Sequence, residues 1–448
     1  MTFASLVLLT GVCASDALPA LENAMPLRVA GPWVVEVGPG TVEVDDTRME
    51  IEQAVTLHVE PPPLVTVQNE RHAALPVFNP KTGGWRKGAR LEELIAQECT
   101  ATGLLLPETL RIRSCEDPTV VYEVGKDYQL DPFWATFGIV EGSAIKPDQP
   151  VLVDYAYHPC RLDNIVLNAN GGVRLVEGET GHGSQLPPKT AEGETVIGRI
   201  WLSGNTETLT DENLYPIALS EPAGPPATPR VAKKLLPETL AKLRKGQPVT
   251  IVAWGDSVTN GGGVGAEHDL WYQHQFGALL RERFPESEIT VLTAAWPGAG
   301  SRQYLEAPAG GKYDFVRDVL DPKPDLVTIE FVNDAYLDEQ GTLAHYTPVL
   351  DRIRANGSEV ILITPHLVRP DWLKTDTEKV DVDPRAYVRG LKQLAEEQDV
   401  ALADASAEWC RLWRKGIPYT TLLGNAINHP DERGHRIFAY ALIALFPK

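Results

Sequence analysis

The sequence is poor in cysteine, in basic residues and in long apolar runs, and each shortage excludes a class of protein. Only five of its 448 residues are cysteine, too few for a disulfide-stapled scaffold, and none lies in the paired spacing that binds zinc. Asp and Glu outnumber Lys and Arg by 61 to 41, which gives a formal net charge of −20. We therefore expect no nucleic acid and no anionic membrane as partners, because both are bound through basic surfaces.

No segment reaches the roughly 18 apolar residues of a membrane-spanning helix. Residues 1–14 are a shorter apolar stretch, and Val12-Cys13-Ala14 suits a signal peptidase. We interpret residues 1–14 as a signal peptide although their first residues contain no Lys or Arg; a truncated start or a buried strand is the alternative. We expect a secreted or periplasmic protein, and otherwise a cytoplasmic one. Three further cysteines in the first half could form one disulfide: Cys99, Cys115 and Cys160.

Residues 25–220 show the short alternating runs of a β-rich domain. Trp33–Val37 and Val151–Tyr157 are such runs, and turn residues such as Gly38-Pro39-Gly40 separate them. The pattern is typical of a β-sandwich or jelly roll, in which Leu91–Gln97 is expected to be a short helix. We find no grouping of catalytic residues here. The domain could bind carbohydrate, shape one wall of an active site, or only stabilise the fold.

Proline marks residues 221–229 as a linker. In residues 230–448 helical and strand patterns alternate, which indicates a parallel sheet covered by helices. The most apolar strand pattern begins at Val249 and breaks at Gly255-Asp256-Ser257. A serine at the carboxyl end of a parallel strand lies where α/β sheets bind ligands, and a tight turn presents its hydroxyl as a nucleophile. Taken alone, Asp256 and Ser257 could equally cap the next helix.

Three more polar segments lie at strand ends in this half. Gly298 and the pair Asn333-Asp334 each follow an expected strand, and His429 lies just before the last helix. Because parallel strands end at one edge of a sheet, we expect these residues to lie beside Ser257.

These four blocks resemble the SGNH (GDSL) hydrolase family, and they occur in the family's order over roughly Gln247–Lys448. The resemblance implies an α/β fold, a flavodoxin-like three-layer α/β/α catalytic domain, which here follows a β-sandwich or jelly-roll-like domain as in a carbohydrate-esterase-like member. We expect no cofactor and no metal.

The resemblance also assigns roles to residues. Ser257 would attack an ester carbonyl, and His429 would take its proton and return it to the leaving alcohol. The oxyanion would be stabilised by the backbone N–H groups of Ser257 and Gly298 and by the side-chain amide of Asn333, each worth about 3 kcal/mol. The expected substrate-pocket residues are Asp256, Trp296, Phe331 and Asp334.

Two positions depart from the family pattern. Phe331 stands where the family usually has glycine, which would make the pocket wall bulkier. Ala426 stands where the family usually has the aspartate that orients the catalytic histidine, and loss of that carboxylate costs about 10⁴ in turnover in the serine-triad template. Asn425, a main-chain carbonyl or, less favoured, Asp404 could orient His429 instead. Otherwise the enzyme works as a Ser–His dyad or has low activity. His435 is the alternative to His429 as the base.

We expect a serine esterase that removes short acyl groups, most often acetyl, from a carbohydrate. Expected export, the added β-rich domain and several aromatic residues support a sugar substrate, and no long apolar loop suggests a lipase. The alternatives are a general carboxylesterase acting on small esters, and a non-catalytic carbohydrate-binding protein with a degenerate SGNH core. The Gly-x-Ser-x-Gly elbow of the α/β-hydrolases is missing around Ser257. The sequence predicts no oligomeric state.

Overall fold

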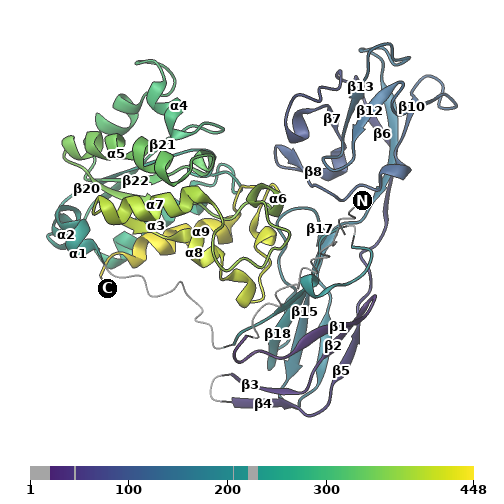
Figure 1. Cartoon of the computed structure of the whole chain (residues 1–448), viewed down its shortest axis with the longest axis horizontal. Helices are drawn as coiled ribbons and strands as arrows, with labels where there is room; N and C mark the ends of the chain where they lie inside the picture. Colours follow the sequence, from purple (N-terminus) through teal and green to yellow (C-terminus); the bar gives the residue numbers. More distant parts are fainter. Residues whose placement is uncertain (1–20, 45–46, 205, 220–230, 448) are drawn as a thin grey trace, which may run out of the picture.

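The computed structural model describes residues 21–44, 47–204, 206–219 and 231–447. The expected signal peptide and the expected linker lie outside these residues. Figure 1 shows a part built of helices around a sheet and a part built of strands, as the sequence predicted. No helix among the described residues is long and apolar enough to cross a membrane.

A five-stranded parallel sheet forms the centre of the α/β part. The strand order is β21-β20-β22-β23-β24, which is the flavodoxin-like order, so the predicted fold class is confirmed. The strands are β20 (Val249–Gly255), β21 (Ile289–Ala295), β22 (Leu326–Glu330), β23 (Glu359–Ile363) and β24 (Ala401–Ala403).

Both faces of this sheet are buried. Successive residues of each strand point to opposite faces, so an unbroken apolar strand packs into a core on either side. In β20, Val249 and Ile251 pack into one hydrophobic core and Val252 and Trp254 into another. The first core is covered by α1 (Ala232–Leu235), α2 (Pro237–Arg244), α3 (Tyr272–Arg283), α8 (Ala405–Trp409) and α9 (Glu432–Ala444). The second is covered by α4 (Ser301–Glu306), α5 (Glu339–Ala355) and α7 (Ala386–Glu397).

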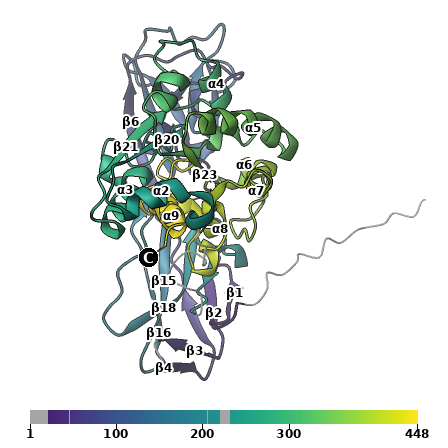
Figure 2. The same ribbon diagram turned by 90° about the vertical axis from the view of Figure 1, so that its left-hand side faces the viewer.

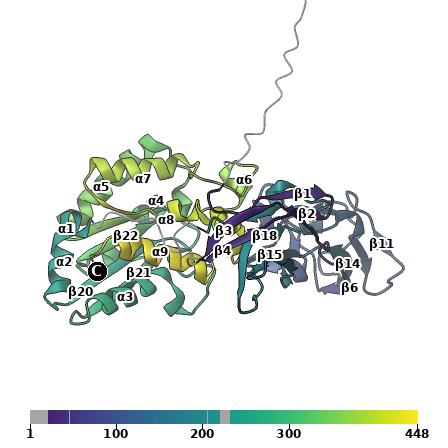
Figure 3. The same cartoon turned by 90° about the horizontal axis from the view of Figure 1, so that it is seen from below.

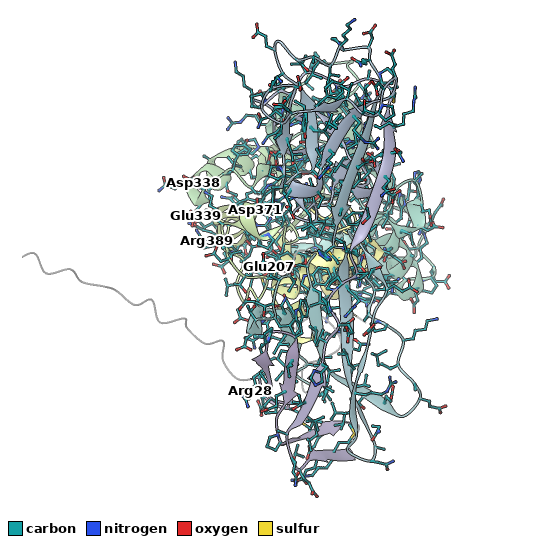
Figure 4. All side chains as sticks on the ribbon, turned by 90° about the vertical axis from the view of Figure 1, so that its right-hand side faces the viewer. Arg28, Glu207, Asp338, Glu339, Asp371 and Arg389 are labelled. Carbon is teal, nitrogen blue, oxygen red and sulfur yellow. The ribbon has the colours of Figure 1, made fainter. Side chains whose placement is uncertain are left out.

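The helices α5 and α7 lie side by side on the outside of the molecule. Arg389 Nε of α7 donates to Glu339 Oε1 of α5 at 2.7 Å, and both side chains lie at one outer edge (Figure 4). The helix α5 begins at Glu339, because Asp338 caps it by accepting a hydrogen bond from Gly341 N.

The β-rich part contains two hydrophobic cores. The first lies between two antiparallel sheets and a hairpin. One sheet consists of β1 (Leu27–Gly31), β2 (Val34–Val37) and β5 (Val55–His58), and the hairpin of β3 (Gly40–Val44) and β4 (Thr47–Ile51). The other sheet consists of β16 (Val173–Val176), β15 (Cys160–Asn168), β18 (Glu194–Leu202) and β19 (Leu214–Pro216), with β17 (Thr180–Gly181) beside β15. The second is built on β11 (Val121–Tyr122), β10 (Arg111–Ser114), β14 (Val151–Tyr157) and β6 (Val65–His72), with β12 (Tyr128–Asp131), β13 (Thr136–Ile139) and β7 (Ala89–Arg90).

A short hairpin replaces the helix expected at Leu91–Gln97. Glu92–Leu94 form a single 3-10 turn, after which β8 (Ile95–Ala96) pairs with β9 (Cys99–Thr100) in antiparallel fashion. Gln97 begins the two-residue turn with φ of 57°, a left-handed conformation that cannot continue a helix. The predicted helix was therefore wrong.

The predicted disulfide was also wrong. Cys99, Cys115, Cys160 and Cys410 are all free thiols. Cys99 is fully buried in a small cluster with Trp134 and with Ile427 of the α/β part, so it packs as an apolar residue.

The two parts are in contact along the carboxyl edge of the parallel sheet. In Figure 2 the β-rich part extends beyond the α/β part at both ends, and Figure 3 shows the two side by side. Arg199 of β18 donates to Gly416 O at 2.8 Å, and Ser184 Oγ donates to Asp431 Oδ2 at 2.6 Å. The guanidinium of Arg369, which precedes α6 (Pro370–Leu373), lies 4.5 Å over the ring of Trp134. The loops that follow the parallel strands therefore face the β-rich part.

Candidate active site

The turn that carries Ser257 follows β20 directly and is fixed by a buried carboxylate. Asp256 accepts hydrogen bonds from Val258 N at 3.1 Å and from Asn333 N at 2.9 Å. Its side chain is fully buried, and this burial raises its pKa to about 7. Asp256 therefore joins the first and third blocks of the site and does not line a substrate pocket, contrary to the expectation.

Ser257 and His429 meet at this turn. His429 Nε2 lies 3.0 Å from Ser257 Oγ, within hydrogen-bond reach for a nucleophile and its base. The loop that carries His429 is built on Asn425, whose side-chain oxygen accepts the N–H groups of Ile427, Asn428 and His429 at 2.9–3.0 Å. Asn425 thus shapes the backbone, and the structure gives no contact of its amide with the imidazole.

Glycines pack directly against this pair. A Cβ on Gly262 would lie 2.8 Å from Ser257 O and 3.0 Å from the His429 ring, and one on Gly263 would lie 1.8 Å from Pro430 O. No residue other than glycine fits such a close approach of two backbones. The loop after the nucleophile therefore forms a wall behind the imidazole.

His435 holds this wall and is not a replacement base. It is fully buried, it accepts a hydrogen bond from Tyr272 N at 3.2 Å on Nδ1, and Nε2 donates to Gly262 O at 2.9 Å. Burial lowers its pKa to about 4. The ring is therefore neutral and uses both nitrogens in structural bonds, which leaves none for Ser257.

Two expected oxyanion donors, Gly298 and Asn333, lie in the loops that follow β21 and β22. Gly298 is exposed and has φ of 79°, and a Cβ on it would meet no protein atom within 4 Å. Glycine is thus required there by the backbone conformation. Asn333 is half-buried, and its amide nitrogen donates one hydrogen to Ala299 O at 3.3 Å, which leaves the second hydrogen for a ligand.

Two other expected pocket residues are buried in the protein. Phe331 is fully buried, and its ring packs 4.8 Å from that of Trp254, so it does not narrow a pocket. Asp334 is also fully buried, where it accepts hydrogen bonds from Ser301 N at 3.0 Å and Tyr346 Oη at 2.6 Å. Both expectations were wrong because these side chains point into the second core of the α/β part.

Trp296 lies just outside the cleft. It is half-buried and stacks on Tyr313 with ring centroids 4.3 Å apart. Its neighbour Pro297 is the residue of this segment that lines the cleft.

The cleft over Ser257 has a volume of about 550 Å³ and opens to solvent. Its lining combines backbone, polar side chains and one indole, and two of its residues come from the β-rich part. The lining residues are Gln97, Glu98, Ser257, Asn260, Gly261, Gly262, Gly263, Gly265, Ala266, His268, Trp271, Pro297 and His429. Of the three roles left open for the β-rich part, the structure thus gives it one wall of this cleft.

Glu98 of the β8–β9 turn is the residue that the sequence analysis missed. Its Oε1 lies 3.1 Å from His429 Nδ1 and accepts a hydrogen bond from Asn425 Nδ2 at 3.0 Å. The contact with the ring is close but too bent for an aligned hydrogen bond, and it becomes an ion pair when His429 is protonated. Burial opposes the ionisation of Glu98, but the contact with His429 outweighs burial and lowers the pKa of Glu98 to about 2.

The other candidates for orienting His429 lie elsewhere. Asp404 caps α8 through Ala407 N and pairs with Lys392 Nζ at 2.7 Å. Ala426 has φ of 59° and carries no carboxylate. The signal that could have found Glu98 was this missing acid, since it implied a carboxylate supplied from outside the α/β part.

Comparison with protein families gives a match in the α/β part. Residues 253–437 match the GDSL-like Lipase/Acylhydrolase family, so the family predicted from the four blocks is confirmed for this part. A search of curated proteins finds no match.

Several solved structures are similar to parts of the chain. A two-domain esterase active on acetylated mannans is 17% identical with a TM-score of 0.38, and the match covers 48% of this chain and 53% of that one. An acetyl xylan esterase is 20% identical with a TM-score of 0.34, over 43% and 97% of the two chains. A lipase/acylhydrolase from Enterococcus faecalis is 18% identical with a TM-score of 0.32, over 44% and 93%. The chain thus spans about half the length of the two-domain mannan esterase.

Proposed function

We propose that residues 253–437, which belong to the GDSL-like lipase/acylhydrolase family, form the catalytic domain of a serine esterase that removes short acyl groups, above all acetyl, from a carbohydrate. The observation that carries this proposal is the contact of 3.0 Å between Ser257 Oγ and His429 Nε2, at the floor of an open cleft. We also propose that the protein acts outside the cytoplasm.

The reaction would proceed through an acyl-enzyme. Ser257 Oγ forms a bond to the ester carbonyl carbon while its proton passes to His429 Nε2. The tetrahedral intermediate collapses, the ester C–O bond breaks, and the same proton leaves on the alcohol. Water then repeats the sequence on the acyl-serine and releases the carboxylic acid.

Three donors would stabilise the oxyanion in both steps. They are the backbone N–H groups of Ser257 and Gly298 and the free amide hydrogen of Asn333. Asp256 accepts from the backbone N–H of Asn333, and Ala299 O accepts from its side-chain amide. Both bonds hold Asn333 in place before substrate binds, which is what makes such donors effective.

The lining of the cleft offers several hydrogen-bonding groups to a substrate. Asn260, His268, Gln97 and the backbone of the glycine loop line it, together with the small apolar residues Ala266 and Pro297. These donors and acceptors suit a sugar, whose hydroxyl groups need hydrogen bonds. A long acyl chain would need a continuous apolar channel.

The test compares wild type with Ser257→Ala and His429→Ala. We expect wild type to hydrolyse 4-nitrophenyl acetate and to release acetate faster from acetylated xylan or mannan, and both variants to lose at least about 10³-fold in kcat. A fluorophosphonate label should attach to the Ser257 peptide in wild type.

Ser301→Ala is the matched control, because Ser301 Oγ also contacts a histidine, His345 Nε2, at 2.7 Å, but is fully buried. Labelling and turnover should persist in this variant. Preference for simple aryl esters over acetylated polysaccharide would favour a general carboxylesterase. An inert wild type that still binds polysaccharide would favour the carbohydrate-binding protein.

A further inference from the structure

Glu98 comes from the β-rich part, yet it lies against the histidine of the α/β part. We propose that Glu98 is the carboxylate that positions His429, so that the active site is completed across the boundary between the two parts. The proposal rests on the proposed function, since a positioning residue acts only where His429 serves as a base.

The chemistry needs an acceptor where Glu98 stands. For His429 Nε2 to accept the proton of Ser257, the neutral ring must carry its own hydrogen on Nδ1. A carboxylate oxygen 3.1 Å from Nδ1 favours that tautomer, and its charge stabilises the imidazolium that forms when the proton arrives. Glu98 stays ionised throughout, because the proton moves between Ser257, His429 Nε2 and the leaving alcohol only.

The hairpin is built to hold this carboxylate in place. Gln97 Nε2 donates to Gly263 O at 3.0 Å, which fastens the turn to the glycine wall, and Arg90 Nη1 donates to Glu98 O at 2.5 Å. On the other side Cys99 is buried against Ile427, two residues before His429. The turn is thus fixed to both the nucleophile loop and the histidine loop.

The backbone of the turn is also strained. Gln97 has φ of 57°, a left-handed conformation that residues other than glycine and asparagine rarely adopt, and two-residue hairpins normally place glycine or asparagine there. Such strain persists where the surroundings enforce it, often at a functional site. Here it directs the next side chain, Glu98, across the boundary.

Asn425 links the new acid to the site that the sequence predicted. Its amide nitrogen donates to Glu98 Oε1 at 3.0 Å, while its oxygen accepts from the backbone of the histidine loop. One side chain therefore fixes the carboxylate relative to the imidazole. Glu98 thus contacts the histidine loop at Asn425, next to Ala426, the position at which the family usually has its aspartate.

The experiment compares Glu98→Gln, Glu98→Asp and wild type in the full chain. We expect Glu98→Gln to lower kcat roughly 10²-fold or more, towards the 10⁴-fold of the serine-triad template, because an amide can donate to Nδ1 and stabilise the wrong tautomer. Glu98→Asp keeps the charge on a shorter arm and should lose less. The rate of fluorophosphonate labelling of Ser257 should follow the same order.

This order separates positioning from a merely structural role. Glutamine matches glutamate in size, so a structural role would make Glu98→Gln the milder change and Glu98→Asp the worse one. Glu93→Gln is the matched control, because Glu93 is an exposed carboxylate five residues earlier and does not line the cleft; its kcat should equal that of wild type. Circular dichroism and thermal unfolding should show all three variants folded.

The outcomes also separate this proposal from the proposed function. If wild type turns over, Ser257→Ala does not, and Glu98→Gln stays within 3-fold of wild type or exceeds Glu98→Asp, the site works as a Ser–His dyad and the role of Glu98 is overturned. If wild type itself neither turns over nor labels at Ser257, the esterase proposal fails first.

Discussion

At the scale of single residues, His435 shows how a buried histidine can serve the site without touching substrate. Its two ring nitrogens bond to Tyr272 N and Gly262 O, so it fixes the wall on which the His429 ring packs. A proton on Nδ1 would remove the acceptor for Tyr272 N. The neutral ring is therefore part of the folded structure.

This arrangement predicts a specific dependence of stability on pH. The pKa of His435 is lowered to about 4 in the fold and is about 6.5 in an unfolded chain. Between pH 6.5 and pH 4 this histidine is protonated in the unfolded chain but not in the folded one. The contribution of the neutral ring to stability is therefore fully present above pH 6.5 and falls as the pH drops towards 4. Urea unfolding of wild type should show this loss, and His435→Gln should reduce it by about 2 kcal/mol between pH 7 and pH 5.

His58, exposed on β5, is the control position. His58→Gln should keep the wild-type change of stability with pH. If His435→Gln lost as much free energy of unfolding between pH 7 and pH 5 as wild type does, His435 would take up a proton in the folded protein as readily as in the unfolded chain.

The sequence could predict the encounter of Ser257 and His429 but not that of His429 and Glu98. The first follows from local rules, because both residues come after strands or before helices of one parallel sheet, whose ends share an edge. The second depends on how two separately built parts pack together. Nothing in the pattern around Glu98 distinguishes it from the other exposed acids of the β-rich part, and the apolar spacing of its segment even indicated a helix.

At the scale of elements, α9 begins just after His429 and helps to hold it. Asp431 caps this helix by accepting from Arg433 N and Gly434 N, and the same carboxylate accepts from Ser184 Oγ of the β-rich part at 2.6 Å. The helix start, the histidine loop and the contact between the two parts therefore share one side chain.

Asp431→Ala should therefore affect both stability and catalysis. Loss of a helix N-cap costs about 1 kcal/mol, and displacement of the histidine loop should lower kcat roughly 10-fold or more. Thermal unfolding and steady-state kinetics measure the two effects.

Asp338→Ala is the matched comparison, because Asp338 caps α5 in the same way on the outer edge of the molecule (Figure 4). It should lose similar stability and keep full kcat. Equal kcat in both variants would mean that α9 does not position His429.

The strands and helices of the α/β part could largely be predicted from their apolar patterns. Buried parallel strands are continuous apolar runs and their helices are amphipathic, so both types are recognisable locally. The β8–β9 hairpin could not, because strands of two residues have no period to detect. The hairpin is held by contacts with the other part, from Gln97 to Gly263 and from Cys99 to Ile427, which no local pattern contains.

At the scale of the whole molecule, catalysis should depend on contact between the two parts. Arg199 Nη1 donates to the carbonyls of Lys415 and Gly416 at 3.2 and 2.8 Å, and neither of these residues lines the cleft. Cys99 is buried where the hairpin meets Ile427, so the reactivity of its thiol reports separation of the parts.

Arg199→Ala should make the parts separate more often. Leaving these two partly buried carbonyls without their donor costs about 2 kcal/mol, which corresponds to a roughly 30-fold larger open population. Modification of Cys99 by a thiol reagent, followed by mass spectrometry, should accelerate by that factor, and kcat should decrease as the open fraction grows.

Arg174→Ala is the control, since Arg174 forms an exposed ion pair with Glu194 that is worth little. Its Cys99 should react at the wild-type rate. If Cys99 in Arg199→Ala reacted only under conditions that unfold the whole chain, the two parts would be a single cooperative unit.

If Glu98 positions His429, the location of Glu98 also limits how the two parts can be exchanged in protein engineering. A chimaera that joins residues 231–447 to another accessory domain would keep Ser257 and His429 but lose the carboxylate that lies 3.1 Å from His429 Nδ1. Such a chimaera should then have low activity, unless the new domain supplied a carboxylate or Ala426 were replaced by aspartate.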